Sequence, residues 1–459
     1  MLRKWQAECV DVAIEHYKTK KNFLALATPA AGKTIMAAEV AFILFENRLI
    51  DFVICFSPST NVANSIQSTF SRRLNREFKG GMGDVGCSYT YQSMRHFNDA
   101  FWQIIRNNRV FVVFDEIHHC AGNSLKEANA WGEDIILNIQ QQASFTLALT
   151  GTPWRSDLLP ITLAKYSDPA NNIQCDYTYS LRQAITDGVC RKPSIVLVDN
   201  DEIKITSNEE ETKIFNSLCD ALKGGMISYK DVITNETVMR YIINLSCKKL
   251  DEIRNTNPGA GGLIVASSVE HAHEILQIIT NDFGQSAIIV NYKEIEPSQK
   301  IDKFRSCETQ WVVSVGMIAE GTDIPRLQVC CHLSRVKTEL YFRQILGRIL
   351  RVSNAINQDA WLFTLAEKSL TTFAKRISQE LPDFDVLIKN KALTNSYFSE
   401  KTEKKTSNNP QPKNDMVIMS ELSSSEFEAL SAQKNNECIS ASIQSFGGFR
   451  KKLINTFTH

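Results

Sequence analysis

Three features that would narrow the class of protein are absent from this sequence. The 51 basic and 51 acidic side chains among its 459 residues cancel, so no global field drives the chain onto nucleic acid. None of the 12 cysteines stands in a Cys-x-x-Cys spacing, which argues against a zinc or iron–sulfur site and against a disulfide framework. No run approaches the ~20 apolar residues that span a bilayer, and no apolar segment follows the charged N-terminus. We therefore expect a cytoplasmic protein with reduced, buried thiols and no membrane partner.

Short apolar runs alternate with helical patterns in two series along the chain. The first series has apolar runs at Phe23–Ala27, Phe52–Phe56, Val110–Phe114 and Phe145–Leu149, with a helical pattern at Thr34–Phe45. The second has apolar runs at Gly262–Ala266, Ala287–Asn291, Trp311–Val315, Val329–Leu333 and Trp361–Thr364, with helical patterns at Glu270–Ile279 and Thr338–Arg351. The alternation predicts an α/β protein with two tandem units, each a parallel sheet flanked by helices.

The chain is divided by changes in composition. We predict a first domain over residues 1–165, a connecting segment and the start of the second domain over 166–258, and a second domain over 259–395. The connecting segment holds a strand-like run, Ser194–Val198, and a helical pattern from Thr212 to Arg254. Residues 396–415 are polar and contain proline, which is typical of a linker. The apolar segment Met416–His459 is interpreted as a small docking helix or two.

The stretch from Ala27 to Thr34 resembles a phosphate-binding loop. It follows an apolar run and opens a helical pattern, and Gly32, Lys33 and Thr34 supply the last three positions of such a loop. Backbone N–H groups would surround phosphate oxygens, with the lysine on the phosphates and the hydroxyl on Mg²⁺. Ala27 and Ala30 stand where glycine is common, and a surface turn with a chance Gly-Lys-Thr is the alternative.

Two carboxylates follow the apolar run Val110–Phe114. Asp115 and Glu116 would lie at the carboxyl end of a strand, where α/β proteins bind their ligands. Asp115 can hold Mg²⁺ through water, and Glu116 can polarise the water that attacks the γ-phosphate. An acidic strand end in solvent is the alternative interpretation.

Several segments occur in a fixed order along the chain. After the phosphate loop and the two carboxylates, a third strand ends in Thr150-Gly151-Thr152-Pro153-Trp154-Arg155. The second half contains Gly321-Thr322-Asp323-Ile324-Pro325 and Gln344-Ile345-Leu346-Gly347-Arg348-Ile349-Leu350-Arg351. From Leu2 to Arg351 the chain resembles helicase superfamily two, and within it the DEAH-type DNA helicases and translocases, which include restriction-type motor subunits of type III restriction enzymes and phage or repair helicases. The resemblance implies two tandem RecA-like domains with ATP and Mg²⁺ in the cleft between them.

The resemblance also implies roles for single residues. The catalytic residues would be Lys33, Asp115, Glu116, Gln344, Arg348 and Arg351. ATP would be bound by Arg3, Gln6, Thr28, Pro29, Ala30, Ala31, Gly32, Lys33, Thr34, Gly321 and Asp323. Thr34 and Asp115 would hold Mg²⁺, mostly through water. Arg348 and Arg351 share one face of the predicted helix and would reach the phosphates bound by the first domain, although a basic helix face in water is the alternative.

The implied nucleic-acid contacts come from both domains. They are Ser57, Pro58, Thr90, Tyr91, Thr150, Thr152, Arg155 and Ser267. Hydroxyls and backbone N–H groups suit phosphates, and such contacts position a strand without reading its sequence. A strand-to-helix turn capped by Ser and Thr is the alternative. His118 and Gln344 would couple the motifs, and His119 has no assigned role.

We expect a nucleic-acid-dependent ATPase, a helicase or translocase that acts on DNA rather than RNA. The alternatives are an RNA helicase and an ATP-gated switch subunit that binds nucleic acid within a defence or restriction complex without unwinding it. A small-molecule kinase would leave the second α/β unit and its arginine motif without a role. We find no nuclease signature, so any strand cutting would belong to a nuclease or other protein partner.

Overall fold

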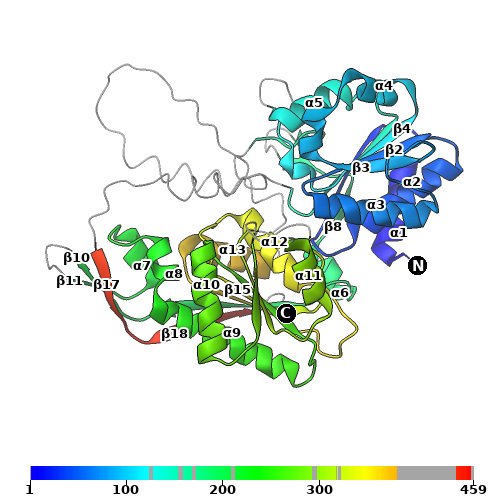
Figure 1. Cartoon of the computed structure of the whole chain (residues 1–459). Helices are drawn as coiled ribbons and strands as arrows, with labels where there is room; N and C mark the ends of the chain where they lie inside the picture. The colour runs from blue at the N-terminus through cyan, green and yellow to red at the C-terminus, as the bar shows by residue number, and fades with distance from the viewer. Residues whose placement is uncertain are drawn as a thin grey trace, which may run out of the picture. The chain divides into compact units, whose positions relative to one another are not determined.

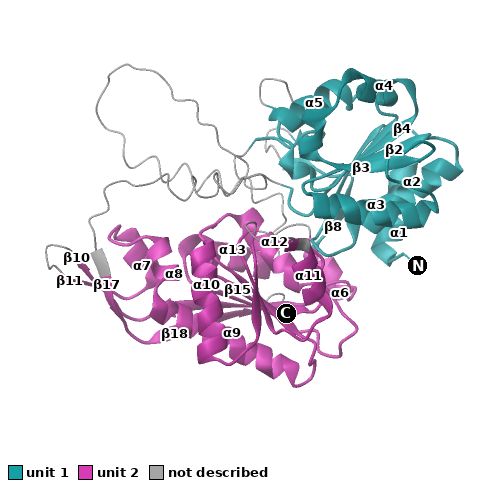
Figure 2. Cartoon of the chain, viewed as in Figure 1, with its two compact units in different colours: residues 1–180, 381–423 teal, residues 181–380, 424–459 magenta. Residues whose placement is uncertain are grey.

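The computed structural model describes residues 2–122, 128–153, 159–167, 172–207, 212–291, 297–316, 318, 322–379 and 441–455. These residues form two compact units, shown in separate colours in Figure 2. The described part of unit 1 ends at residue 180, and unit 2 comprises the described residues from 181 onward.

Unit 1 is a six-stranded parallel sheet with strand order β3-β2-β4-β5-β1-β8. Its elements are α1 (Lys4–His16), β1 (Asn22–Ala27), α2 (Lys33–Glu46), β2 (Phe52–Ser57), α3 (Thr60–Leu74), β3 (Gly86–Thr90), the 3₁₀ helix η1 (Tyr91–His96), α4 (Asp99–Asn107), β4 (Val110–Phe114), the 3₁₀ turn η2 (Ile117–His119), α5 (Ala130–Asn138), β5 (Phe145–Thr150), β6 (Lys165–Ser167), β7 (Asn172–Gln174) and β8 (Tyr177–Tyr179). Figure 1 shows α2 and α3 on one side of this sheet and α4 and α5 on the other.

The central strands of unit 1 are buried because helices cover both faces of the sheet. Every residue of β4 is buried, and five of the six residues of β1 are buried as well. A parallel strand covered on both faces is apolar along its whole length rather than at alternate positions, as the sequence pattern indicates. Strands β4, β5 and β1 are neighbours, so their carboxyl ends meet at one edge of the sheet.

Unit 2 is built on a seven-stranded sheet with the order β13-β14-β12-β15-β16-β9-β18. Its elements are α6 (Leu181–Thr186), β9 (Pro193–Asn200), β10 (Ile203–Ser207), β11 (Thr212–Phe215), α7 (Leu218–Lys223), α8 (Tyr229–Ile233), α9 (Glu236–Arg254), β12 (Gly261–Val265), α10 (Val269–Gln277), the π-helix η3 (Ile278–Asp282), β13 (Ala287–Val290), α11 (Pro297–Ser306), β14 (Trp311–Ser314), β15 (Leu327–His332), α12 (Glu339–Ile349), β16 (Ala360–Leu365), α13 (Lys368–Gln379), β17 (Ala441–Phe446) and β18 (Phe449–Asn455). All strand pairs of this sheet are parallel except β18 with β9.

The C-terminal strands correct the interpretation of residues 416–459 as docking helices. Within the described residues 441–455 the chain forms β17 and β18. Strand β18 pairs with β9 from Phe449 opposite Asn200 to Asn455 opposite Ser194. Strand β17 pairs with β10 in a small sheet of order β11-β10-β17. For residues 441–455 the prediction was wrong because the partner strands lie about 250 residues earlier, beyond the reach of local periodicity.

The turn between β9 and β10 lies against the turn between β17 and β18. The backbone N–H of Gly447 donates to the carbonyl of Glu202 at 2.7 Å, and that of Asp201 donates to the carbonyl of Gly448 at 3.0 Å. A Cβ on Gly448 would lie 2.7 Å from a carboxylate oxygen of Asp201, so a larger residue there would displace this exposed side chain. The hairpin of β17 and β18 is thus fitted onto the hairpin of β9 and β10.

Other boundaries differ from the predicted ones by a few residues. The helical pattern expected from Thr212 begins instead with β11 and becomes helical at α7. Strand β8 pairs with β1, so unit 1 continues past the expected boundary at residue 165. The expected linker, residues 396–415, lies outside the described residues. No described helix is long and apolar enough to cross a membrane.

Candidate active site

The phosphate loop of unit 1 connects β1 to α2. The N–H of Thr28 donates to the carbonyl of Tyr179 at 3.1 Å, and the N–H of Ala31 donates to the carbonyl of Thr28 at 3.2 Å. Gly32 caps α2 with a φ of +94°, and a Cβ there would lie 3.0 Å from Gln6 Nε2. Glycine is therefore required at this position by both the backbone angle and the close approach.

The two alanines that replace glycines differ in their consequences. Ala27 is the last residue of β1, and strand geometry suits alanine. Ala30 has a φ of +68°, in the left-handed region. For a residue with a Cβ this conformation costs about 1–2 kcal/mol. The surrounding loop holds that strain, which is common at ligand-binding segments.

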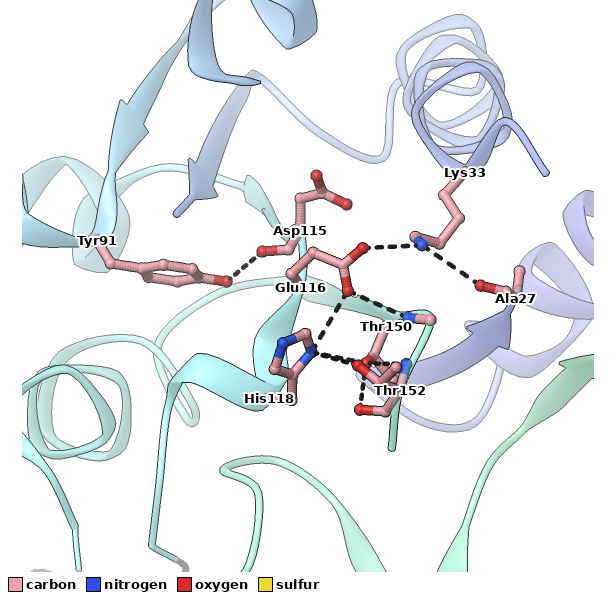
Figure 3. Close-up of polar contacts among 9 residues, drawn as sticks. Ala27, Lys33, Tyr91, Asp115, Glu116, His118, Thr150 and Thr152 are labelled. Carbon is pink, nitrogen blue, oxygen red and sulfur yellow. Dashed lines mark hydrogen bonds and ion pairs between the residues drawn. The ribbon is translucent and has the colours of Figure 1, made fainter. Parts of the chain in front are cut away.

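Lys33 and Glu116 form an ion pair at the carboxyl edge of the sheet (Figure 3). Lys33 Nζ lies 2.9 Å from Glu116 Oε1 and donates to the carbonyl of Ala27 at 3.4 Å. The Lys33 side chain is only 9% exposed. Glu116 itself has a φ of +52°, so the turn after β4 aims its carboxylate at the loop from a strained backbone.

The ionisation of Glu116 is set by opposing effects. Burial favours the neutral acid and would raise the pKa of this carboxyl, but Lys33 and His118 favour the carboxylate. The net result holds the pKa of Glu116 well below its usual value. Glu116 is thus a carboxylate at neutral pH and able to accept a proton or orient water.

His118 connects this carboxylate to the end of β5 (Figure 3). Its Nδ1 lies 3.4 Å from Glu116 Oε2, 3.0 Å from Thr150 Oγ1 and 3.4 Å from Thr152 Oγ1. The backbone N–H of Gly151 donates to Glu116 Oε2 at 3.1 Å. The segment after β5 therefore contacts the carboxylate both directly and through the histidine.

Asp115 is buried beside Glu116, with its backbone held on two sides. Its N–H donates to the carbonyl of Phe56 at 2.8 Å, and its carbonyl accepts from Tyr91 Oη at 2.8 Å. Within the described residues no group of three or more His, Cys, Asp or Glu could hold a metal ion. Asp115 carries a carboxylate and Thr34 a hydroxyl, which are oxygen donors of the kind that Mg²⁺ prefers, and their role as its ligands stays a prediction.

The start of α1 is attached to the phosphate loop. Arg3 Nη1 donates to the carbonyl of Ala31 at 2.7 Å, and Gln6 Nε2 donates to that of Gly32 at 2.9 Å. Gln6 Oε1 accepts from the N–H of Arg3 at 2.8 Å. The two residues expected to bind ATP thus support the loop, and direct contact with the base stays a prediction.

In unit 2, the two predicted arginine fingers converge on one carbonyl. Arg348 Nη1 and Arg351 Nη1 each donate to the carbonyl of Thr322 at 2.6 Å. Arg351 also pairs with Asp323, whose side chain is 68% exposed. Burial lowers the pKa of Arg351, but Asp323 opposes this effect, so the guanidinium stays charged. Gly321 lies outside the described residues, and Gln344 lies on α12.

The predicted nucleic-acid contacts are mostly enclosed within their units. Five of these side chains are buried: Ser57, Tyr91, Thr150, Thr152 and Ser267. The hydroxyl of Ser57 donates to the carbonyl of Ser59 at 3.3 Å, and that of Ser267 lies 2.8 Å from His271 Nδ1. Pro58 and Thr90 are half-buried, and Arg155 lies outside the described residues. Contact of these segments with nucleic acid stays a prediction.

Two contacts were not predicted from the sequence. Trp5 stacks on Tyr179 with ring centroids 4.8 Å apart, which joins α1 to the strand beside the loop. The aromatic residue between Arg3 and Gln6 could have pointed to this contact. Arg191, which binds the segments around Arg351, belongs to no motif.

The fold and this constellation define a chain of two RecA-like units with a phosphate loop in the first. Residues 1–155 match the family "Type III restriction enzyme, res subunit", and residues 244–353 match "Helicase conserved C-terminal domain". These matches confirm the resemblance to helicase superfamily two and, within it, to the restriction-enzyme subunits.

Individual relatives agree with this family. An uncharacterized protein of Mycobacterium leprae is 28% identical over 393 residues, which cover 83% of this chain and 64% of that protein. A DNA 3'-5' translocase of Sulfurisphaera tokodaii is 24% identical over 381 residues, covering 76% of this chain and 78% of the relative. The chain therefore spans less than two thirds of the mycobacterial relative's length.

A solved structure shows the same fold. A fragment assigned as the HsdR subunit of a type I restriction enzyme from Vibrio vulnificus superimposes with a TM-score of 0.56 at 18% identity. The match covers 83% of this chain and 66% of that fragment. The predicted fold of two tandem RecA-like domains is confirmed.

Proposed function

We propose that this protein is a nucleic-acid-dependent ATPase that acts as a DNA helicase or translocase. The observation that carries the proposal is the convergence of Lys33, Glu116 and His118 at the edge where β1, β4 and β5 end. Phosphoryl transfer to water needs positive charge on the phosphates and a group that orients the attacking water. Lys33 can supply the charge, and Glu116, held by His118, can orient the water.

Each residue of unit 1 has a distinct role in this proposal. The N–H groups at the start of α2 and Lys33 would bind the phosphates of ATP, while Thr34 and Asp115 would hold Mg²⁺. The metal would neutralise charge on the phosphates. Glu116 orients the attacking water and takes its proton. His118 relays the state of this carboxylate to Thr150 and Thr152.

Binding of ATP has to rearrange the ion pair of Lys33. The ammonium lies 2.9 Å from Glu116, whereas its proposed partners are phosphate oxygens. Once Lys33 turns to phosphate, Glu116 retains His118 and the N–H of Gly151 and becomes available to water. Because of this exchange of partners, the carboxylate of Glu116 is able to orient water only when nucleotide is bound.

Unit 2 supplies the remaining positive charge in this proposal. Arg348 and Arg351 complete the site when ATP draws the two units together, and they stabilise the charge that develops in the transition state. Hydrolysis releases them, and the cycle moves the units along a nucleic-acid backbone. Gly321 and Asp323 would accompany this change.

DNA is the proposed track because the translocase from Sulfurisphaera tokodaii, a relative over most of both chains, acts on DNA. The proposed backbone contacts stay those predicted from the sequence: Ser57, Pro58, Thr90, Tyr91, Thr150, Thr152 and Arg155 in unit 1, with Ser267 in unit 2. A nuclease or other protein partner is proposed on the likeness to restriction-enzyme motors.

The test is ATP hydrolysis measured with single-stranded DNA, duplex DNA, forked DNA and RNA, with Glu116→Gln as the inactive reference. Stimulation by DNA above the Glu116→Gln background is expected. Full stimulated hydrolysis in Glu116→Gln would overturn the assignment of the site. A parallel strand-displacement assay separates a helicase from a translocase or an ATP-gated switch, which would hydrolyse ATP without releasing a strand.

A further inference from the structure

Arg191 is a buried arginine near the start of unit 2, and it belongs to none of the motifs described above. It precedes β9, and its side chain is 2% exposed. Its guanidinium makes hydrogen bonds to two segments at once. Nη1 donates to the carbonyls of Leu327 at 2.6 Å and Ile349 at 3.4 Å, and Nη2 donates to the carbonyl of Pro325 at 3.1 Å.

The loop after Arg351 completes this set of acceptors. Arg191 Nη2 donates to Ser353 Oγ at 3.0 Å, and Nε donates to Gln358 Oε1 at 3.0 Å. Gln358 Nε2 in turn donates to the carbonyl of Ser353 at 2.9 Å. The guanidinium therefore fixes both the end of α12 and the loop that follows it.

The backbone around Arg191 contacts the same segment. The N–H of Arg191 donates to the carbonyl of Leu350 at 2.7 Å, and Cys190 forms an antiparallel bridge with Arg351. Main chain and side chain of one residue thus bind residues 349–353. A displacement of Arg191 would therefore break both its main-chain and its side-chain contacts with residues 349–353.

The acceptors of Arg191 are all neutral. Three are carbonyls, one is a hydroxyl and one is an amide oxygen. Burial lowers the pKa of Arg191 to about 10, so it remains charged at neutral pH. A buried cation with five dipolar acceptors fixes geometry, since each acceptor has to point at the planar fork.

The two segments that Arg191 joins are those that carry the arginine fingers and their acceptors. Pro325 and Leu327 follow Thr322 and Asp323, which bind Arg348 and Arg351. Arg348 and Arg351 connect the end of α12 to Thr322. Arg191 therefore adds a second connection between the same two parts of the chain, residues 349–353 and residues 322–327.

We propose that Arg191 is a positioning residue for ATP hydrolysis, which holds residues 349–353 against residues 322–327 and so fixes the guanidinium groups of Arg348 and Arg351. This inference rests on the proposed function. A displacement of about 1 Å at reacting groups can cost about 10²-fold in rate, so the contribution is measurable although Arg191 touches no substrate.

The test compares Arg191→Met with Arg254→Met in the full chain. Arg254 is a matched control because its guanidinium also binds carbonyls of unit 2, those of Ala260 at 2.6 Å and Glu308 at 3.3 Å, and it lies outside both segments. Both variants lose carbonyl-bound guanidinium contacts. Only Arg191→Met should lower kcat, by about 10²-fold, and leave KM for ATP within about twofold, since the nucleotide loop is in unit 1.

Two further variants distinguish positioning from general destabilisation. Arg191→Lys retains a cation with three donors and should recover part of kcat. In the double variant Arg191→Met with Arg351→Ala, the two losses should not add, because Arg191 acts through Arg351. Additive losses, or equal kcat values for Arg191→Met and Arg254→Met, would overturn the proposal.

A readout independent of hydrolysis separates this inference from the proposed function. Hydrogen exchange of peptides covering 322–327 and 345–353 should accelerate in Arg191→Met and stay near wild type in Arg254→Met. A wild-type chain without stimulated ATPase contradicts the proposed function alone. Unchanged exchange in Arg191→Met contradicts the positioning role, whatever the ATPase shows.

Discussion

The two units hold their cationic groups in different ways. In unit 1, Lys33 faces the carboxylate of Glu116, so the site is neutralised within itself. In unit 2, Arg348 and Arg351 both donate to the carbonyl of Thr322, Arg351 also pairs with the exposed carboxylate of Asp323, and Arg191 binds neutral acceptors. The ion pair of Lys33 is a contact that phosphate can displace, whereas the carbonyl contacts of the arginines fix the direction of their guanidinium groups. Unit 1 is thus arranged to exchange partners and unit 2 to hold its guanidinium groups in place.

The largest effect is expected from removing the exchanging cation. Lys33→Ala should abolish nucleotide binding and bring stimulated hydrolysis to background, because no ammonium then faces the phosphates. Glu116→Gln should bind a fluorescent nucleotide and lose about 10²–10⁴-fold in kcat, the usual contribution of a general base. Lys18→Ala, on the exposed end of unit 1, is the control and should match wild type. Tight nucleotide binding by Lys33→Ala would break the comparison.

The next effect concerns the charge presented by unit 2. Arg351→Ala should bind ATP normally and lose about 10³–10⁵-fold in kcat, the contribution of an arginine finger. Phosphate release and nucleotide titration measure the two properties separately. Arg343→Ala, on the same helix but paired with Glu339 at 3.1 Å, should retain hydrolysis. Equal losses in both variants would favour a structural role for the whole helix.

A third prediction concerns the contribution of the C-terminal hairpin, β17 and β18, to the free energy of unfolding of unit 2. A chain that stops after residue 440 loses β17 and β18, uncovers β9 and removes the buried side chain of Ile454. The free energy of unfolding of unit 2 should fall by about 3 kcal/mol or more, while nucleotide affinity in unit 1 stays unchanged. The control replaces exposed Lys451 and Lys452 with serine and should have little effect. An unchanged unfolding transition would make the hairpin dispensable.

A fourth prediction uses pH to distinguish the units. Burial lowers the pKa of His271 and His332, both in unit 2, from 6.5 to about 4. Between these values the unfolded chain binds protons that folded unit 2 does not, so its stability falls as the pH drops from 6.5 towards 4. The slope is about 1.4 kcal/mol per pH unit for each histidine. Denaturant unfolding of His332→Gln should show about half of this dependence, and exposed His273→Gln should retain all of it.

The smallest effect is expected at the strained loop residue. Ala30→Gly relieves a φ of +68° and should leave stability unchanged or raise it by about 1 kcal/mol. Ala31→Gly, next to it without a positive φ, should lower stability by about 0.5–1 kcal/mol because the unfolded chain gains freedom. Thermal unfolding of the two variants measures the difference. Equal shifts would mean that the loop stores no strain at Ala30.

The strand ends of unit 1 were predictable because chemistry and periodicity coincide there. Continuous apolar runs led directly to Ala27, Asp115 and Thr150, and parallel topology brings such ends to one edge. The ion pair of Lys33 with Glu116 was not predictable. It depends on the backbone of Glu116 at positive φ, an angle that no residue type in that segment demands.

Short edge elements escaped the sequence analysis for a different reason. Strand β3 is a five-residue edge strand, half-exposed beyond its first two residues, and it gives no continuous apolar run. Strand β18 is exposed along most of its length and is recognised as a strand only through its pairing with β9. The role of Arg191 was not predictable from local sequence either, because its five acceptors are spread over residues 325–358.

The pairing of β18 with β9 also has a consequence for synthesis on the ribosome. Strand β9 emerges about 250 residues before its antiparallel neighbour. At about 5–20 residues per second, one edge of the unit 2 sheet stays open for on the order of ten seconds or more. During that time β9 presents unpaired N–H and C=O groups to any other strand, including one of a neighbouring nascent chain. The seven-stranded sheet of unit 2 is thus complete only when residues 441–455 arrive.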